Sequence, residues 1–474
     1  MADAIRETVI ARAVRERGTA REKTDERLRM TFWIFVFLML TDGIFRRWIL
    51  PGSVGQIFLV IRDPFVLYAV VIGWNAGYIR NGHAVMMMVL GVVSFLSALV
   101  FGHGNLFVAL YGMRIIFLYF PFMYVMARVL RRDDVLMLGK VMLLILIPNV
   151  LLTIVQFFSP QSAFVNLGVG QDEAGAGFSG GAMGYYRPPG MFNMGTILGY
   201  YGITYGFLLY FLISPEDSRR MGLSKRFLIA CMIAYLVSIP VSISRTHFAQ
   251  TFIITCFFFV VLVRQGRAMK KIVPIIILML IVFPLLMLIP DMQLFVEVFT
   301  ARFEGANETE GGLANSAVNR SFGYMFRSLA DVPVMGFGTG QFSNVGMMYT
   351  YGVTNNIDIP KFKYIADSTE MELGRIIGED GLIVGMLIIL TRWHMMFRLG
   401  VRALRKLWSA GDCLPWMLLP FSCLELFWGQ LKASYNLAWM SMIVISCLTA
   451  LKYTRRKRSP AGGTTSGKND WDGK

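Results

Sequence analysis

Residues 135–158 read VLMLGKVMLLILIPNVLLTIVQFF, a run in which Lys140 is the one charged residue. An α-helix rises about 1.5 Å per residue, so a helix of this length crosses a hydrocarbon core about 30 Å thick. Apolar runs of about 17 to 24 residues, each long enough for such a crossing, recur from Thr31 to Leu451. The repetition predicts an all-α fold, that of a polytopic membrane protein.

The composition supports this class. Of the 474 residues, 55% are hydrophobic and 16% are charged, whereas an ordinary soluble domain has about 25% charged residues. The 31 Met and 37 Phe residues add to the apolar content. This composition excludes a disordered protein and argues against a soluble enzyme of this size.

We expect about twelve transmembrane helices, and the boundaries are good to a few residues. They cover residues 31–45, 54–73, 84–101, 106–127, 135–158, 191–213, 226–242, 246–263, 272–290, 377–396, 413–429 and 434–451. The expected domain organisation is therefore a charged helical N-terminal segment (1–30), nine helices (31–290), one long loop (291–376), three helices (377–451) and a basic tail (452–474). Residues 1–30 have no apolar core, so no cleavable signal peptide is expected.

The charge pattern predicts the topology. Lys and Arg outnumber Asp and Glu by 46 to 30, a net charge of +16. Basic residues concentrate in cytoplasmic loops, and the loops obey this rule when both termini lie inside, with Arg46 and Arg47 as the exception. The inside groups are Arg80, Arg128, Arg131, Arg132, Arg219, Arg220, Lys225, Arg226, Arg264, Arg267, Lys270, Lys271, Arg398, Arg402, Arg405, Lys406 and the basic tail. Membrane topology explains the positive net charge better than nucleic-acid binding does, because no basic patch on a soluble segment is visible. The basic C-terminal tail fits an anchor on anionic lipid.

The cysteines and histidines give no metal or redox pattern. Five cysteines lie in apolar segments without a CxxC pair, so neither a disulfide framework nor a zinc site is predicted. Four histidines are scattered along the chain, which argues against a histidine-based metal centre. We therefore expect no cofactor.

Two extracytoplasmic segments stand out. Residues 159–190 are Gly-rich and end in Tyr185-Tyr186-Arg187-Pro-Pro-Gly190. The long loop contains a stretch from Asn315 to Leu329 with apolar residues at helical spacing, which predicts a folded, amphipathic helix along the membrane face. Long ordered loops are commonly functional.

Charged groups within a membrane are costly and need a reason. The candidates are Asp42, Arg62, Asp63, Arg114, Arg187, Arg245, Arg320, Glu370, Glu372, Arg375, Glu379 and Glu425. Arg62-Asp63-Pro64 is predicted in the middle of a helix, where a structural ion pair at a kink competes with a role in lining a cavity. Arg114 needs either an anion or a carboxylate partner, for which Asp42 and Asp63 are possible.

Three arginines fall on the predicted outer face, namely Arg187, Arg245 and Arg320. Three converging guanidinium groups can clamp a diphosphate through paired hydrogen bonds. The alternative is that each extends to lipid phosphates independently of the others.

The segment from Gly336 to Gly340 is a Gly-rich turn without the spacing of a nucleotide-binding loop. Farther on, Glu372, Arg375 and Glu379 have the spacing of a helical ion-pair ladder. Glu370 has no partner on that ladder, so it is the better candidate for a general base.

The order of these motifs is informative. Arg-x-x-Gly-x-Phe-Asn stands at 187–193, Ser-x-Ser-Arg-Thr at 242–246, Asn-Arg at 319–320, Pro-x-x-Gly-x-Gly-x-Gly at 333–340 and Glu-x-Gly at 379–381. This set, over about residues 140–400, resembles the O-antigen ligase and O-antigen polymerase superfamily of bacterial envelope glycan enzymes. The resemblance covers the expected twelve helices and the long outer loop before the tenth.

The resemblance implies a metal-independent glycosyltransferase in the bacterial inner membrane, with both termini inside. Its donor would be a polyprenyl-diphosphate-linked glycan, and its acceptor another glycan. Arg245 and Arg320 would hold the donor diphosphate with Arg187 nearby. The resemblance also implies membrane lipids, a flippase and a chain-length regulator as partners. It does not imply nucleic acid as a partner.

One position departs from the family pattern. The family often has a His eleven residues before the Gly of Glu-x-Gly, and counting back from Gly381 gives Glu370. A carboxylate can also accept a hydroxyl proton, so Glu370 is the expected base. The departure favours an exopolysaccharide or O-antigen polymerase over a lipid A–core ligase. Arg114 and Glu372 are further candidates for substrate contact.

Tyr185 and Tyr186 are expected to stack on sugars, although tyrosine is also common at membrane interfaces. Three other functions stay open at this point. A ligase would move the glycan to lipid A–core. A lipid-linked oligosaccharide flippase or another transporter would explain the helix count and the intramembrane charges. A non-catalytic assembly subunit is the third alternative.

Overall fold

The structure is a computed structural model that describes residues 2–168, 181–193, 196–266, 288, 290–310, 318–343, 345–346, 349, 372–431 and 434–452. These residues are mostly helical, and seven of their helices are long and apolar enough to cross a membrane. The seven are Arg21–Ile49, Ile57–Asn75, Gly82–Val100, Leu106–Val129, Arg132–Phe158, Thr196–Ile213 and Arg245–Arg264. The expected all-α membrane protein is thus confirmed.

These spans coincide with seven of the twelve expected helices. Three more expected helices correspond to α9 (Lys225–Val241), α18 (Leu414–Trp428) and α19 (Ser434–Lys452). The expected helix at 272–290 lies almost wholly outside the described residues, and the expected helix at 377–396 is part of a longer element, α17 (Glu372–Ala410). The total of twelve spans therefore stays a prediction.

In chain order, the described elements are helices, a few short helical turns and one β-hairpin. Before α9 they are α1 (Ala2–Ile44), the π-helical turn η1 (Phe45–Ile49), the 3₁₀ helix η2 (Gly52–Leu59), α2 (Asp63–Asn75), α3 (Gly82–Val100), α4 (Leu106–Phe117), α5 (Tyr119–Val129), α6 (Arg132–Phe158), η3 (Phe164–Asn166), β1 (Gly181–Ala182), β2 (Tyr185–Tyr186), α7 (Thr196–Ile213) and α8 (Pro215–Arg220). After α9 they are α10 (Arg245–Arg264), α12 (Pro290–Glu310), the π-helical turn η4 (Asn319–Gly323) and α14 (Tyr324–Asp331), followed by α17, α18 and α19.

The segment around Arg62 differs from its prediction. Arg62, Asp63 and Pro64 are not in the middle of a helix, because α2 begins at Asp63 and Pro64 occupies its first turn. Proline fits there, since the N–H it lacks would have no partner in the helix. The 3₁₀ helix η2 supplies the first part of this span instead. The expected position of Arg62 and Asp63 in the middle of a helix is therefore wrong.

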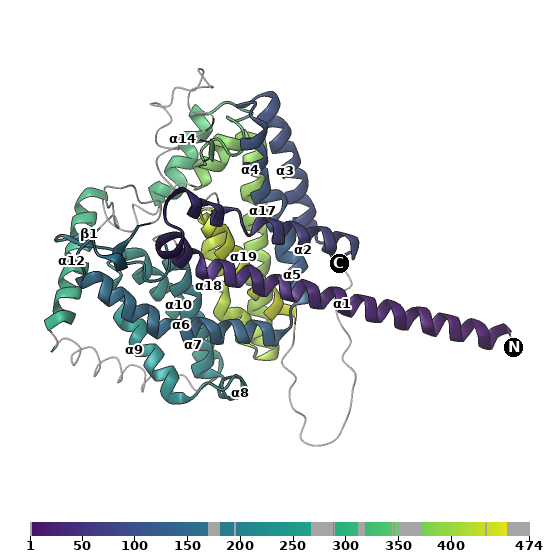
Figure 1. Ribbon diagram of the computed structural model, residues 1–474, viewed down its shortest axis with the longest axis horizontal. Helices are drawn as coiled ribbons and strands as arrows, with labels where there is room; N and C mark the ends of the chain where they lie inside the picture. The colour runs from purple at the N-terminus through teal and green to yellow at the C-terminus, as the bar shows by residue number, and fades with distance from the viewer. Residues whose placement is uncertain are drawn as a thin grey trace.

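The core of the molecule lies around α7 and α19. Nearly every residue of α7 is buried, and α7 is in contact with α6, α9, α10, α18 and α19. In α19 the residues from Leu437 to Cys447 are almost completely buried. By contrast, α3 keeps one face of large apolar side chains exposed, among them Val89, Val93 and Leu96, as expected for a helix that faces lipid. Figure 1 shows α1 extending at its N-terminal half away from this core.

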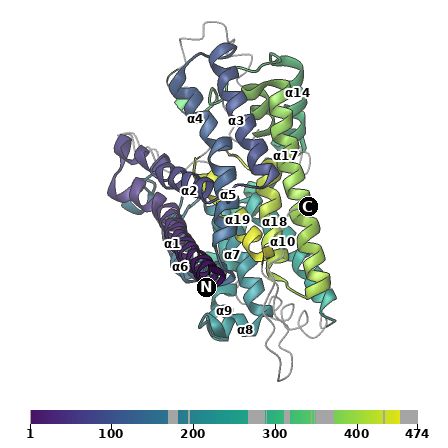
Figure 2. The same ribbon diagram turned by 90° about the vertical axis from the view of Figure 1, so that its right-hand side faces the viewer.

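The element α17 reverses direction near its start. Gly381 has φ 78° and ψ 179°, a conformation that favours glycine. The segment 372–380 consequently folds back along the helix that follows, and a Cβ placed on Gly385 would lie 3.0 Å from Ile376 O. The helix after Gly381 then runs beside α3 and through most of the height of the molecule (Figure 2). The expected uninterrupted helix from 377 is therefore wrong, and its first residues belong to the folded-back segment.

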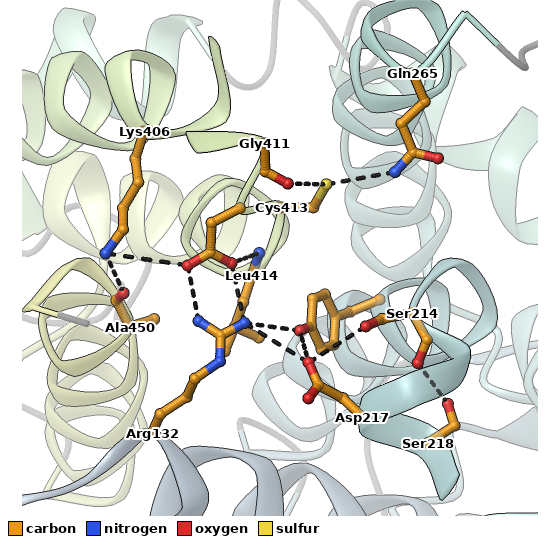
Figure 3. A network of polar contacts seen from close by, with 12 residues as sticks. Arg132, Ser214, Asp217, Ser218, Gln265, Lys406, Gly411, Cys413, Leu414 and Ala450 are labelled. Carbon is orange, nitrogen blue, oxygen red and sulfur yellow. Dashed lines mark hydrogen bonds and ion pairs between the residues drawn. The ribbon is translucent and has the colours of Figure 1, made fainter. Parts of the chain in front are cut away.

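A polar network joins several helix ends on the side predicted to be cytoplasmic (Figure 3). Arg132, at the start of α6, donates to both carboxylate oxygens of Asp412 at 2.7 and 3.0 Å and to Tyr210 Oη at 2.8 Å. Lys406 of α17 donates to the carbonyl oxygen of Leu451 at the end of α19, at 2.7 Å. The network therefore fixes how α6, α7, α17, α18 and α19 meet.

The expected long loop is partly helical. It contains α12 and, with η4 and α14, the amphipathic helix predicted from Asn315 to Leu329, which is confirmed over the described residues 318–329. Met325 is buried and Phe322 packs against Trp393 and Phe427, whereas Phe326 stays exposed. The position of this helix relative to a membrane stays a prediction.

Candidate anion-binding site

Ser244 joins two of the predicted arginine motifs. It precedes α10 as its N-cap, and its Oγ accepts the backbone N–H of His247 at 3.3 Å. The same Oγ accepts a hydrogen bond from Nη2 of Arg187 at 3.1 Å. Because Arg245 is the next residue after Ser244, this contact brings Arg187 close to Arg245 although they are far apart in sequence.

The turn before α10 is strained at Ile243. This β-branched residue has φ 48°, a left-handed conformation that such side chains rarely adopt. It is buried, as are Ser242 and Ser244 on either side of it. Backbone strain of this kind is concentrated at functional sites in proteins.

A third arginine comes from α12. Phe248, one helical turn after Arg245, packs against Phe299 and Phe303 of α12, with ring centroids 6.2 and 6.4 Å apart. Arg302 lies between these two phenylalanines in sequence. Contacts between α12 and β1, visible at the edge of the molecule in Figure 1, place the same helix beside the hairpin that leads to Arg187.

The three guanidinium groups form an arginine cluster, defined as Arg187, Arg245 and Arg302. Burial, with repulsion from Arg302 and Arg245 as the smaller cause, lowers the pKa of Arg187 to about 10. Nε of Arg187 is buried and has no acceptor among the described residues. Repulsion between buried like charges is relieved by an anion, so the arrangement is suited to bind a multiply charged one.

The rest of the motif at 187–193 anchors the loop that carries Arg187. The backbone N–H of Gly190 donates to Gln156 Oε1 at 2.8 Å, and that of Met191 donates to Asn149 Oδ1 at 2.9 Å. Asn193 Nδ2 donates to Asp42 at 2.7 Å. Polar residues of α1 and α6 therefore hold this loop rigidly.

The two tyrosines of the motif differ in position. Tyr185 stacks on Phe157, with ring centroids 4.6 Å apart and an interplanar angle of 13°. Tyr186 is 45% exposed and pairs with Gly181 in the hairpin. Tyr186 is thus available to a ligand, whereas one face of Tyr185 is covered. Sugar stacking by either residue stays a prediction.

Two predicted catalytic residues lie partly or wholly outside the described part of the structure. Arg320 lies in η4 on the part of the chain that packs against α17, and its side chain is outside the described part of the structure. Glu370 also lies outside the described residues. The roles expected for both residues therefore stay predictions.

The two remaining candidates for substrate contact are buried beside opposite charges. Arg114 donates to a carboxylate oxygen of Asp63, and Asp63 also accepts a hydrogen bond from Tyr119 Oη at 2.6 Å. Asp63 is one of the two partners that the sequence left open, and it satisfies Arg114 without a substrate. Glu372 is 2% exposed and lies 3.9 Å from Nη1 of Arg392.

The Gly-rich turn is already occupied by a carboxylate of the protein. Glu379 accepts the backbone N–H groups of Gly340 and Phe342, each at 2.8 Å. Gly340 has φ 85°, and a Cβ there would lie 2.4 Å from Val108 O. Backbone N–H groups arranged in this way can bind phosphate, but here they bind Glu379, so the turn locks the start of α17 against α3 and α4.

Sequence reasoning identified Arg187 and Arg245 but missed Arg302 and Arg392. Arg302 lies in a segment of average composition. The one sequence feature that could have pointed to it is the helical spacing of Phe299 and Phe303 on either side of it. Within the described residues, no group of three or more His, Cys, Asp or Glu side chains is arranged to hold a metal ion. In comparisons with known proteins, no family model, no curated protein and no solved structure matches this chain.

Proposed function

We propose that this protein is a membrane glycosyltransferase that polymerises polyprenyl-diphosphate-linked oligosaccharide units on the outer face of a bacterial inner membrane. The observation that supports the proposal is the arginine cluster beside the turn between α9 and α10, an end of the bundle that the charge pattern predicts to be extracytoplasmic. A polyprenyl diphosphate combines a long apolar chain with a multiply charged headgroup. A site at a helix end of an apolar bundle suits both parts.

In the proposed reaction, a hydroxyl of the acceptor glycan attacks the anomeric carbon of the donor. The bond from that carbon to the phosphate oxygen breaks, and the polyprenyl diphosphate leaves with the electron pair. Negative charge grows on the leaving group, so Arg187, Arg245 and Arg302 would stabilise the transition state more than the bound donor. The donor is already activated, so the reaction needs no nucleotide, and the resemblance to the O-antigen ligase and polymerase superfamily implies that it needs no metal ion. A carboxylate of the protein accepts the hydroxyl proton, and Glu370 is the candidate that the sequence predicts for this role.

The test uses membrane vesicles from the native host, which carry its own lipid-linked oligosaccharide. Arg187→Gln, Arg245→Gln and Arg302→Gln should each lower polymer formation on the order of 100-fold, because each removes one charged donor from the leaving group. Arg219→Gln is the matched control, since Arg219 is exposed on α8 and distant from the cluster. Full-length polymer from all three cluster variants would reject the proposed donor site.

A ligase would use the same donor site and would differ in its acceptor. The two are separated by whether the glycan made in cells is attached to lipid A–core or to another lipid-linked unit. A transporter would form no glycosidic bond at all. Purified protein that lengthens lipid-linked glycan in vesicles therefore excludes a transporter and a non-catalytic assembly subunit together.

A further inference from the structure

A second charged cluster lies between α17 and α18, outside the arginine cluster. It consists of Glu372, Arg392 and Glu425. Glu372 and Arg392 are both in α17, and a straight helix would place them about 30 Å apart. The reversal at Gly381 instead brings Glu372 Oε1 to 3.9 Å from Arg392 Nη1.

Arg392 holds the end of α18. It is completely buried, and it donates to the carbonyl oxygens of Leu426 at 3.1 Å, Glu425 at 3.0 Å and Gly429 at 3.1 Å. A guanidinium at the C-terminus of a helix satisfies carbonyls that lack a partner in the helix. The hydrogen bonds of Arg392 are therefore made mainly to the backbone, and its Nη1 has no acceptor among the described residues.

The carboxylates of this cluster are only partly satisfied. Oε2 of Glu372 and Oε2 of Glu425 are both buried without a hydrogen-bond donor among the described residues. Arg392 and Glu372 are the charged groups that act on Glu425. Two carboxylates therefore share one guanidinium, and an excess buried negative charge is costly unless a proton or another cation arrives.

The cluster lies at the same end of the bundle as Arg245. Trp416 Nε1 donates to Phe257 O at 2.9 Å, and Gln265 Nε2 donates to Cys413 Sγ at 3.6 Å, so α10 and α18 run antiparallel in contact. From Phe257 back to Arg245, α10 rises about 18 Å, and from Trp416 on to Glu425, α18 rises about 14 Å. Arg245 and Glu425 are therefore at similar levels of neighbouring helices.

We propose that Glu425 is the proton acceptor of the transfer reaction, an inference that rests on the proposed function. As the acceptor hydroxyl oxygen forms its bond to the anomeric carbon, its proton moves to the Glu425 carboxylate, and the diphosphate departs with the electrons of the broken bond. Glu372 is less suited because it is 2% exposed and faces Nη1 of Arg392, whereas Glu425 is partly exposed. Arg392 positions Glu425 through the backbone of α18.

The experiment uses the full-length protein in vesicles from the native host, and it measures polymer formation and binding of added polyprenyl diphosphate separately. Glu425→Gln should lower the rate at least about 100-fold with diphosphate binding unchanged, because it removes the base and leaves the arginine cluster intact. Glu425→Asp keeps the carboxylate but withdraws it by one methylene group. We expect its rate to lie between that of the wild-type protein and that of Glu425→Gln. Glu304→Gln, at an exposed position of α12, is the control.

The outcomes separate the inference from the function. If the wild-type protein makes polymer and folded Glu425→Gln makes it at the same rate, the inference is overturned and the proposed function stands. Loss of activity in Glu370→Gln alone would likewise overturn the inference and would assign the base to Glu370. If Glu425→Gln does not fold, a wild-type rate in Glu425→Asp overturns the inference instead. A wild-type protein that makes no polymer overturns the proposed function and the inference with it.

Discussion

At the scale of single residues, Arg187 is held in a position that is unfavourable for its own charge. Burial and two neighbouring guanidinium groups lower its pKa, and Ser244 is the single hydrogen-bond acceptor found for it among the described residues. A bound anion would therefore relieve the cost of this buried charge and its repulsion by the neighbouring arginines. The Arg187 side chain therefore lowers the stability of the folded protein and at the same time favours the binding of an anion.

Replacing Arg187 should consequently have opposite effects on stability and on binding. Arg187→Gln is expected to stabilise the protein without a bound anion on the order of 1 kcal/mol, once the screening of a partly exposed charge is allowed for, because it removes a buried charge and, to a smaller extent, its repulsion by Arg302 and Arg245. It should weaken polyprenyl diphosphate binding. Thermal unfolding in detergent and a binding titration measure the two effects, and a loss of stability in the empty protein would contradict the repulsion.

The same residue predicts how binding depends on pH. Arg187 is charged in the empty site below its pKa of about 10, and a bound anion raises that pKa. The affinity for polyprenyl diphosphate should therefore be constant from neutral pH to about 9 and should fall as the pH rises through 10. The titration is repeated on Arg187→Gln, which should lose this alkaline decline.

Ser244 has two roles that a matched pair of variants can separate. Ser244→Ala removes the N-cap of α10 and the acceptor for Arg187, whereas Ser224→Ala removes only the N-cap of α9, an exposed serine that accepts the N–H of Phe227. Each change should cost about 1 kcal/mol of stability. Only Ser244→Ala should also lower polymer formation. Equal activity in the two variants would mean that the Arg187 contact is dispensable.

At the scale of elements, α17 shows how one glycine changes what a helix can do. Without the reversal at Gly381, Glu372 would be about 30 Å from Arg392, and the charged cluster at the end of α18 would not exist. The reversal depends on a positive φ and on close contact with the segment that follows α14. Local helical propensity alone would continue the helix.

Gly381→Ala should therefore be strongly destabilising. A Cβ at this position would lie 2.3 Å from Val334 O, and the backbone conformation disfavours any side chain. Gly400→Ala, farther along the same helix, has nothing within 4 Å of the added Cβ and should instead stabilise by about 0.5 to 1 kcal/mol. Melting temperatures that shift in the same direction for both variants would disprove the proposed reversal.

At the scale of the whole molecule, the two ends of the bundle are built differently. The predicted cytoplasmic end is closed by the network around Arg132, in which carboxylates, carbonyls and hydroxyls satisfy the buried charges (Figure 3). The opposite end holds the arginine cluster and the Glu372, Arg392 and Glu425 cluster, which both keep unsatisfied polar atoms among the described residues. Satisfied charges stabilise a structure, and unsatisfied ones indicate where a ligand binds.

The network around Arg132 can be tested as a structural element. Asp412→Ala removes the main partner of a buried guanidinium and should cost about 3 kcal/mol or more of stability. Asp133→Ala breaks an ion pair with Arg220 in which both side chains are about half exposed, and it should cost no more than about 1 kcal/mol. Unfolding of the two variants in detergent compares them directly, and similar losses would show that the network is not closed to solvent.

Much of this architecture was predictable from local sequence. Runs such as residues 135–158 are long and apolar enough to form a helix across a membrane whatever helices lie beside them. The free energy of transferring such a run from water to lipid depends on its own length and composition. The N-cap at Ser244 and the early position of Arg245 follow from the same local rules. The exact partners of charged residues do not, since any of several carboxylates could have balanced Arg114.

The sequence by itself determined the all-α membrane class, the approximate positions of most described helices, and Arg187 and Arg245 as anion-binding candidates. Only the tertiary structure decided that Arg302 joins them, that Asp63 is the partner of Arg114, and that Glu372 meets Arg392. The physical reason is that the hydrophobic pattern of a segment specifies only that helix and its apolar surface. Contacts between charged side chains depend on how helices distant in sequence pack together, through aromatic side chains and close approaches at glycine.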